Sequence, residues 1–448
     1  MPDYSRPISA LPGIGWPAIP NAVDAAVMAL AQQFAASEWW PAEILRRAQF
    51  EQARTLVRFA AETVPFYRDR LANFAKLDVF ALAEAWHEIP VLTRADIQGQ
   101  TEAMSTTALP KGHGPTGQAS SSGSTGLPVV VKSTRVTVMF YRAINLRYHR
   151  WHGREFHRTC GIIRALRGGR EGAGKSWVHG FRTGANHTLD IVRPVAEQLD
   201  WLMERDIAYL LTYPTNLAAL LRHSRETGRR PESLVEVSTM SELFDPALRD
   251  LCREVWGVPV HDMYSAQELG MMALECPAEP HYHVQAESIL LEVLDDDGRP
   301  CKPGEVGRLV ATDLHNFAQP LIRYALGDHA EAGASCSCGR GLPVLNRILG
   351  RTRNQVRLPG GGTFWPVVMF SHYAAAAPLK QMQLVQKSLS DVTLRMVARR
   401  ALTADEEAEV AKLVRRDLGH PFNVTFEVVD AIERGANGKY EDFRSEVG

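Results

Sequence analysis

The most informative stretch of the sequence is Ala119-Ser120-Ser121-Ser122-Gly123-Ser124-Thr125-Gly126-Leu127-Pro128, which the β-branched run Val129-Val130-Val131 follows. Hydroxyls and glycines this dense suit neither a core nor a helix. They suit a loop whose backbone N–H groups and hydroxyls surround the oxygens of a polyphosphate. The competing interpretation is a flexible Ser/Gly turn, and composition alone does not separate the two. Residues further along the chain must decide.

The composition is that of an ordinary globular chain. Its 448 residues are 45% hydrophobic and 23% charged, which is enough for two or three domains. Lys plus Arg (50) nearly balance Asp plus Glu (51), so no net charge favours nucleic acid or an anionic membrane surface as a partner. The first residues lack a basic segment followed by an apolar one, and no run approaches the ~20 apolar residues of a membrane span. We therefore expect a cytoplasmic small-molecule enzyme.

A second phosphate-binding candidate is the segment Gly169-Arg170-Glu171-Gly172-Ala173-Gly174-Lys175-Ser176, which matches the G-x-x-x-x-G-K-S pattern. A true P-loop must open a helix whose N-terminus faces the phosphates. The following residues, 177–184, contain two glycines and no 3.6-residue period. We interpret the match as a surface loop, and keep a kinase or NTPase that uses Lys175 as a remote alternative.

The middle of the chain alternates helical and extended patterns. We expect helices over 41–61, 195–204, 215–227 and 245–257, with Thr215 as the cap of the third. We expect strands over 207–211, 234–237 and from 258 onward. This alternation predicts a largely parallel, helix-covered α/β layer. In such sheets, ligands bind at the carboxyl ends of the strands.

The segment His261-Asp262-Met263-Tyr264-Ser265-Ala266-Gln267-Glu268 lies at such an end. An aromatic residue, carboxylates and a hydroxyl stand where apolar packing would be expected. One interpretation is a helix-capping turn before Leu269. The functional interpretation is an adenosine shelf from Tyr264 and a magnesium ligand from Glu268, because Mg²⁺ takes oxygen ligands together with substrate phosphates.

Two further regions complete the pattern. Residues 288–294 and 305–312 predict a hairpin, and Gly327-Asp328 predicts a turn. Residues 382–388 and 392–397 alternate like a second hairpin, and 424–429 predict a strand. Between them, the capping box Thr403-Ala404-Asp405-Glu406 opens a helix that extends to Leu418. The last ninety or so residues therefore predict a small α+β domain.

Five motifs now stand in a characteristic order. They are the Ser/Gly loop at 119–128, Tyr-Ser-Ala-Gln-Glu at 264–268, Arg-Tyr-Ala-Leu-Gly-Asp at 323–328, Leu-Gly-Arg at 349–351 and Asn-Gly-Lys at 437–439. In this order they resemble the adenylate-forming (acyl-adenylate synthetase) superfamily. Residues 60–69 look like the N-terminal signature of its phenylacetate–CoA ligase-like branch, which includes relatives associated with capsule biosynthesis. The resemblance covers about residues 50 to 448.

The resemblance implies an α/β fold with two domains. Residues 1–350 would form a large multi-layer adenylation domain with helix-covered sheets and a β-hairpin subdomain. Residues 351–448 would form a small mobile α+β lid, and Pro359-Gly360-Gly361-Gly362 loosens the chain near the junction. Closure of this lid would exclude water from a reactive adenylate.

It also implies a two-step reaction. A carboxylate attacks the α-phosphorus of ATP and expels pyrophosphate, and a thiol, most simply that of coenzyme A, captures the acyl group. Both substrates of the first step are anions, so Mg²⁺ and a cation near the attacking oxygen must lower the barrier. The glycine-rich loop around Lys439 would present that cation.

By similarity, residues of this sequence take the corresponding roles. The triphosphate cradle is Ser122, Gly123, Ser124, Thr125 and Gly126, the magnesium ligand is Glu268, Tyr264 stacks on adenine and Asp328 binds the ribose diol. Ser241, Glu242, Asp262 and Arg351 join the cofactor-binding set, and Lys439 and Glu268 are the catalytic residues.

Several positions depart from the family pattern. Leu127 stands where a lysine often follows the cradle, Gln267 replaces the usual threonine, and no acidic hinge residue follows Arg351. These changes leave adenylation intact. They put thioester formation in more doubt, because reorientation of the C-terminal domain serves that second step in the family.

Six cysteines in so long a chain do not form a secreted disulfide framework. Cys336 and Cys338 offer two thiolates, and Cys276 with His281 or His283 offers a third and a fourth ligand for a structural Zn²⁺. Some members of the branch carry zinc at comparable positions, and their C-x₆-H spacing favours His283. The alternative is free thiols beside turns.

The acid itself is not identified by the sequence. In the family the acyl pocket lies around Trp201, Tyr213 and Ser241-Glu242, and the aromatic residues favour an aromatic acid over a fatty acid, although they equally suit a core. The acceptor also stays open, because an adenylating enzyme that loads a carrier protein or forms an amide shares the first step. The oligomeric state is open as well, with a homodimer as one option.

Overall fold

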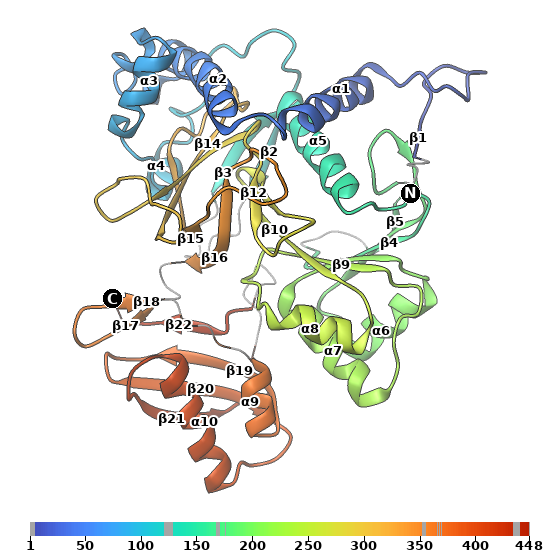
Figure 1. Ribbon diagram of the computed structural model, residues 1–448, viewed down its shortest axis with the longest axis vertical. Coiled ribbons are helices and arrows are strands. Elements are labelled where there is room, and N and C mark those ends of the chain that lie inside the picture. Colours follow the sequence, from blue (N-terminus) through green and yellow to red (C-terminus); the bar gives the residue numbers. More distant parts are fainter. Residues whose placement is uncertain are drawn as a thin grey trace.

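The computed structural model describes residues 5–120, 129–166, 171–174, 176–351, 355–364, 366, 368, 370–432 and 440–447. A twelve-stranded sheet dominates the fold, with N-terminal helices at its upper end and a separate C-terminal sheet at its lower end (Figure 1). The mixed α/β architecture predicted from the sequence is confirmed. Among the helices of the described residues, none is both long and apolar enough to cross a membrane.

The large sheet has the strand order β13-β14-β15-β16-β12-β11-β10-β9-β8-β4-β7-β5. Its strands are β4 (Cys160–Arg164), β5 (Gly172–Gly174), β7 (Asn186–Asp190), β8 (Tyr209–Thr212), β9 (Glu236–Met240), β10 (Val260–Ala266), β11 (Gly270–Glu275), β12 (Tyr282–Val284), β13 (Ile289–Leu294), β14 (Val306–Asp313), β15 (Tyr324–Ala332) and β16 (Val344–Arg351).

The parallel half of this sheet runs from β10 through β9, β8 and β4 to β7. Helices α6 (Val195–Glu204), α7 (Pro214–Thr227) and α8 (Ala247–Val255) cover one face, and α1 (Ala22–Ser37) and α5 (Arg135–Trp151) cover the other. Side chains alternate along each strand, so Val260 packs beneath α6–α8 while Met263 packs beneath α1 and α5. The carboxyl ends of β8, β9 and β10 line a cavity, at the edge where the sequence predicts a ligand.

The antiparallel half consists of β11–β16. The predicted hairpin around residues 296–298 is confirmed as β13 and β14. Its apolar face packs on an N-terminal helical layer, made of α2 (Ala42–Thr63), η1 (Pro65–Tyr67), η2 (Phe74–Lys76), α3 (Val79–Ala85), η3 (Trp86–Glu88) and α4 (Arg94–Gln100). Among the described residues, three short pairings lie outside the two larger sheets, namely β2 (Thr116–Ser120) with β3 (Val130–Thr134), β1 (Arg6–Pro7) with β6 (Phe181–Arg182), and β17 (Val356–Arg357) with β18 (Thr363–Phe364). The last of them lies beside the C-terminal sheet, because Val356 packs in its core.

The C-terminal sheet has the order β21-β20-β19-β22. It is formed by β19 (Leu379–Gln386), β20 (Asp391–Ala398), β21 (Asn423–Val428) and β22 (Phe443–Ser445), with α9 (Phe370–Ala376) and α10 (Ala404–Asp417) beside it. The predicted capping box starts α10, because the Thr403 side chain accepts from the Glu406 N–H and the Glu406 side chain accepts from the Thr403 N–H. The core of this part, built around residues such as Val410 and Leu394, is separate from the cores of the large sheet.

The C-terminal sheet contacts the large sheet's helices through α7. Arg222 places its guanidinium 4.1 Å from the ring centroid of Phe370 and donates to the Lys380 carbonyl at 3.0 Å. Glu226, one turn further along α7, pairs with Arg399. The two parts therefore meet across polar, partly exposed contacts rather than a shared apolar core.

Candidate active site

A cavity of about 1000 Å³ opens at the carboxyl ends of β8, β9 and β10 and reaches the segment that follows residue 439. Its wall contains most of the described residues that the sequence predicts for the site, namely Ser241, Glu242, Asp262, Tyr264, Glu268 and Asp328. Tyr440 and the three residues after it also line the cavity. The large sheet and the C-terminal segment thus share one cavity.

Tyr264 and Glu268 are held by a hairpin and not by a helix start. Strands β10 and β11 are antiparallel neighbours, and Gly270 has a φ of +73°, which favours glycine at this tight connection. The alternative of a helix-capping turn before Leu269 is therefore wrong. The hairpin carries both Tyr264 and Glu268 at the wall of the cavity.

Tyr264 and Asp328 are brought together from different strands. The Tyr264 hydroxyl donates to Asp328 Oδ2 at 2.7 Å. Asp328 lies within β15 and is paired in register with Arg351 of β16. The turn predicted at Gly327-Asp328 is therefore part of a strand, in which Gly327 has a φ of +78°. The phenol and the carboxylate form one hydrogen-bonded unit in the cavity wall.

Glu268 faces a cation that the sequence analysis did not predict. Its carboxylate lies 3.6 Å from Arg94 Nη1, and the Glu268 side chain is only 10% exposed. Arg94 is the first residue of α4, whose start is fixed by the Thr93–Asp96 capping box. The only sequence signal for this arginine was the capping box that places it at the start of a helix.

Asp262 is a buried residue of the cavity wall. Its carboxylate accepts hydrogen bonds from Thr239 Oγ1 at 2.6 Å and from the Tyr282 hydroxyl at 2.8 Å. Burial raises the pKa of Asp262 to about 7. Both carboxylate oxygens are thus engaged with protein donors, which makes Asp262 a support for strands β9 and β10, and its contact with a cofactor stays a prediction.

Ser241 and Glu242 leave the end of β9 at the edge of the cavity. Ser241 has a φ of +71°, a strained conformation for a residue with a side chain. Glu242 Oε2 accepts from Thr215 Oγ1 at 2.6 Å, and Glu242 Oε1 accepts from the Tyr440 N–H at 2.7 Å. Thr215, which we expected to cap α7, is instead the second residue of that helix, because Pro214 begins it. Glu242 therefore joins α7 to the chain segment directly after Lys439.

Some predicted residues lie outside the described part of the chain: the cradle Ser122, Gly123, Ser124, Thr125 and Gly126, as well as Lys439 and Lys175. The described strands β2 and β3 pair up to Ser120 and Val130, so the cradle segment connects two neighbouring strands. Around the G-x-x-x-x-G-K-S match, the described residues 172–174 form strand β5 and those from 176 to 190 contain no helix. The described residues of this segment therefore do not open a helix, as a P-loop would require, and residues 172–174 pair with β7 as an edge strand where we expected a loop.

The inner end of the cavity differs from the predicted acyl pocket. Tyr213 lines the cavity. Trp201, a residue of α6, packs instead against the core between the large sheet and α6–α8. Instead, α5 supplies a wall, and buried polar residues around Arg154 form the floor. Sequence reasoning missed these residues because they come from segments that only the fold brings together.

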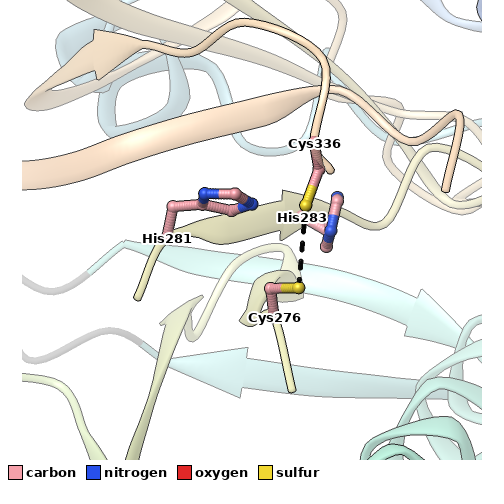
Figure 2. Close-up of side chains that lie close together, drawn as sticks. All are labelled: Cys276, His281, His283 and Cys336. Carbon is pink, nitrogen blue, oxygen red and sulfur yellow. Dashed lines mark hydrogen bonds between the residues drawn. The ribbon is translucent and has the colours of Figure 1, made fainter. Parts of the chain in front are cut away.

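A group of potential metal ligands lies apart from this cavity, where β11, β12 and the β15–β16 connection meet. Cys276, His281, His283 and Cys336 place their ligand atoms within 4.8 Å of one another. Figure 2 shows the sulfur atoms of Cys276 and Cys336 facing each other, with the two imidazoles beside them. Cys338 joins the group through its sulfur, 3.4 Å from His283 Nε2. The structure thus gathers all five residues named by the sequence analysis.

The spacing of these ligand atoms fits a tetrahedral zinc site. With Zn–S near 2.3 Å and Zn–N near 2.1 Å, the edges of a tetrahedron are about 3.8 Å between two sulfurs and about 3.6 Å between sulfur and nitrogen. The Cys276–Cys336 sulfur distance is 3.8 Å and the Cys338–His283 distance is 3.4 Å. His281 Nε2 is a buried atom with no hydrogen-bond partner among the described residues, so it competes as a fifth donor.

Comparison with known proteins agrees with this geometry. A family model described as the CapK C-terminal domain matches residues 362–445. A phenylacetate–coenzyme A ligase of Thermus thermophilus is 29% identical over 419 residues, which cover 89% of this chain and 88% of that ligase. The chain is thus similar to the phenylacetate–CoA ligase-like branch of the adenylate-forming superfamily, the resemblance indicated by its motifs. The motif order and the assembled cavity wall are those expected of an adenylate-forming enzyme.

Solved structures of this superfamily share the fold. The 2-hydroxyisobutyryl-CoA ligase in its postadenylation state, in complex with 2-HIB-AMP, matches with a TM-score of 0.72 and 20% identity, over 91% of this chain and 90% of that one. The same ligase in its thioesterification state matches with a TM-score of 0.59 and 21% identity, over 92% and 91%. Both structures share the fold of the present chain, and the first of them matches it with the higher TM-score.

Proposed function

We propose that this chain activates a small carboxylic acid with ATP to an acyl-adenylate, releases pyrophosphate, and transfers the acyl group to the thiol of coenzyme A. The observation that carries the proposal is one cavity that joins Tyr264, Glu268 and Asp328 to Glu242 and Tyr440, the residue after Lys439. The relatives' names, a phenylacetate–CoA ligase and a 2-hydroxyisobutyryl-CoA ligase, support the same reaction class.

In the first step, an oxygen of the substrate carboxylate forms a bond to the α-phosphorus of ATP, and the bond to the β-phosphate oxygen breaks. Pyrophosphate leaves with that electron pair. The approach of two anions is unfavourable unless fixed positive charge compensates it. We assign this role to Lys439, and assign the cradle Ser122–Gly126 to the phosphate oxygens. Magnesium, bound with ATP and held by Glu268, would neutralise phosphate charge.

Further residues would hold the nucleotide. The Asp328 carboxylate suits a ribose diol, because it can accept two hydroxyl hydrogen bonds, and its hydrogen bond from Tyr264 fixes its orientation. The Tyr264 ring would then lie beside adenine. We assign Arg351 and Ser241 to the same nucleotide end, since Arg351 is paired in register with Asp328 and Ser241 lines the cavity.

In the second step, the coenzyme A thiolate attacks the acyl carbon and AMP leaves. We propose that residues 351–448 act as a lid that reorients between the two steps, with 1–350 as the adenylation domain. Polar, partly exposed contacts at α7 support this proposal, because such an interface can be exchanged without exposing a core.

We also propose a structural zinc ion held by Cys276, Cys336, Cys338 and His283. Four protein ligands leave no open coordination position, so the ion would cross-link β11, β12 and the β15–β16 connection rather than take part in catalysis. The six cysteines form no disulfide, which suits the reducing conditions of the cytoplasm, where we place the enzyme.

Carboxylate-dependent exchange between ATP and labelled pyrophosphate tests the proposal. A panel of aryl, heteroaryl and short aliphatic acids is assayed with the wild type and with Lys439→Ala and Lys175→Ala. We expect exchange with at least one acid, loss of about 10²-fold or more in Lys439→Ala, and wild-type exchange in Lys175→Ala. Exchange that requires no acid, or that depends on Lys175, would overturn the proposal.

The acceptor is tested with the acid found in that panel. Thioester formation is compared with coenzyme A, with a carrier-protein thiol and with hydroxylamine as a neutral trap. We expect coenzyme A to be the preferred thiol. Preference for a carrier protein or for an amine would assign the chain to that alternative class while leaving the first step in place. A homodimer stays a prediction, which light scattering of the purified protein checks.

A further inference from the structure

The inner end of the cavity contains a hydrogen-bonded chain of polar side chains that ends in an unused donor group. Arg154 Nη1 lies 2.8 Å from His149 Nδ1, and His149 Nε2 lies 2.9 Å from Asn145 Oδ1. Arg154 and His149 are each 8% exposed. All three residues line the cavity that holds Glu268 and Asp328.

The direction of each hydrogen bond in this chain is fixed by chemistry. A guanidinium can only donate, so His149 Nδ1 must accept. Burial, and then the nearby Arg154 charge, lower the pKa of His149 well below its ordinary value, so its ring is neutral and carries its proton on Nε2. That proton is donated to Asn145 Oδ1, and the Asn145 amide is therefore oriented with its NH₂ group away from His149.

The Asn145 NH₂ group has no hydrogen-bond partner in the described part of the chain, whereas Asn145 Oδ1 is bonded to His149. Asn145 is partly exposed and lies in the cavity wall on α5. The NH₂ group can therefore donate to a group in the cavity. A ligand that reaches this point must offer a hydrogen-bond acceptor, because an apolar group there would leave the donors unsatisfied.

The charge of this cluster is balanced within the protein. Arg154 Nε donates to Glu236 Oε1 at 3.0 Å, and Arg154 Nη2 donates to Glu236 and, at 2.8 Å, to Ser238 Oγ. Tyr148, whose ring lies 4.2 Å from the Arg154 guanidinium, donates its hydroxyl to Ser238 at 3.1 Å. The guanidinium is thus paired with a buried carboxylate, and the site favours a neutral acceptor over a second carboxylate of the substrate.

The depth and the walls of this region define the size of the ligand. Along β9, Ser238 lies three residues before Ser241 at the cavity edge, a separation of about 10 Å at the usual rise of a strand. On α5, Tyr141 and Tyr148 lie four residues before and three residues after Asn145, on the same side of the helix. Trp177 meets His149 edge to face at a centroid distance of 5.0 Å and also lines the cavity. Aromatic walls at this spacing suit a flat ring.

We propose that Asn145 determines the specificity of the acyl pocket, and that the substrate is a flat aryl carboxylic acid with a neutral hydrogen-bond acceptor at the end remote from its carboxylate. This inference rests on the proposed adenylation reaction and narrows its substrate class. Arg154 and His149 act as positioning residues, because their hydrogen bonds orient the Asn145 amide.

The test uses pairs of acids that differ only in the acceptor. Isonicotinate and benzoate form one pair, and 4-pyridylacetate and phenylacetate form a longer one. In each pair a ring nitrogen replaces a C–H group. We compare kcat/KM from pyrophosphate release with the full-length enzyme. For at least one pair we expect the wild type to prefer the pyridine acid by about tenfold, the effect of about one hydrogen bond.

Two substitutions of Asn145 extend the test. Asn145→Leu removes the donors and should reduce the preference to about twofold or less. Asn145→Asp presents an acceptor instead, so its preference should change to an acid with a distal donor, 4-aminobenzoate over 4-methylbenzoate. Arg150→Ala, on the exposed side of the same helix, is the matched control and should keep the wild-type ratio. If Asn145→Leu does not fold, the isosteric Asn145→Asp still decides the question.

The outcomes separate this inference from the proposed function. If no carboxylate in the broad panel supports pyrophosphate release, the adenylation proposal fails. If carboxylates are activated but neither pair shows a preference, or if the preference persists in the Asn145 variants, the specificity inference is wrong while adenylation stands. Activation of fatty acids alone would also overturn it.

Discussion

Glu242 gives the sharpest test of how the two parts of the chain cooperate. Its Oε1 accepts the Tyr440 N–H at 2.7 Å, and its Oε2 accepts both the hydroxyl and the N–H of Thr215. Tyr440 directly follows Lys439, so this contact fixes the backbone next to the proposed catalytic cation. The perturbation is Glu242→Gln, which keeps the size of the side chain and removes its charge.

The expected magnitude follows from the donors around Glu242. Thr215 supplies two donors, so the single oxygen of glutamine is needed there, and its NH₂ group is left facing the Tyr440 N–H. A hydrogen bond to a charged group contributes about 1.5–3 kcal/mol. Loss of the hydrogen bond between Glu242 and Tyr440 should make the arrangement that contains it about 10- to 100-fold less populated, and should slow adenylation by the same factor.

The assay separates the two half-reactions. Pyrophosphate exchange reports adenylation, and addition of coenzyme A to a preformed acyl-adenylate reports thioester formation. We expect Glu242→Gln to slow the first strongly and to change the second by less than about threefold, because the contact fixes the backbone next to Lys439, which we assign to adenylation.

A matched control lies in the same interface. Glu226 pairs with Arg399 across it, but both side chains are about half exposed, so Glu226→Gln should change either rate by less than about twofold. Equal loss in both half-reactions of Glu242→Gln would refute the account. A raised KM for ATP at unchanged kcat would instead make Glu242 a nucleotide contact.

Three further predictions concern stability and metal content. Because burial raises the pKa of Asp262 to about 7, its contribution to stability is fully present below its unfolded pKa near 4 and is lost as the pH rises through 7. Between pH 5 and pH 8 the free energy of unfolding should fall about 2 to 3 kcal/mol more in the wild type than in Asp262→Asn. Urea unfolding at both pH values measures this, and an equal fall in the two proteins would contradict it. Arg147 is buried and paired with Glu38 and Glu287, so Arg147→Met should cost about 3–5 kcal/mol by leaving both carboxylates without their shared partner, and an unchanged melting temperature would rule this out. Purified protein should contain about one zinc per chain by elemental analysis, and Cys336→Ser should lose the metal and melt at a lower temperature; a metal-free wild type with the same stability would exclude the zinc site.

Local patterns in the sequence predicted much of the fold. The capping box of α10, the periodic helix α6 and the hairpin of β13 and β14 all depend on residues close in sequence, and all three are confirmed. The sequence was less informative where distant contacts decide. Pro214 starts α7 one residue before the predicted cap Thr215, whose side chain instead donates to Glu242.

Only part of the site could be predicted from the sequence, again because motifs are local and contacts between distant segments are not. Ordered motifs led to Tyr264, Glu268 and Asp328, which the fold gathers on one cavity wall. Arg94 and the chain from Arg154 through His149 to Asn145 carry no motif, because their roles depend on burial and on contacts between separate segments. The pairing of Asp262 with Thr239 and Tyr282 is also a property of the folded sheet and not of the local sequence.

The central claim is that the chain splits ATP between its α- and β-phosphates in a carboxylate-dependent way. Chromatography of the nucleotide products, with the wild type, ATP, coenzyme A and an acid that supports turnover, tests this most directly. We predict one AMP and one pyrophosphate for each acyl-CoA formed, and neither product without the acid. Formation of ADP and phosphate in place of AMP and pyrophosphate would contradict the account.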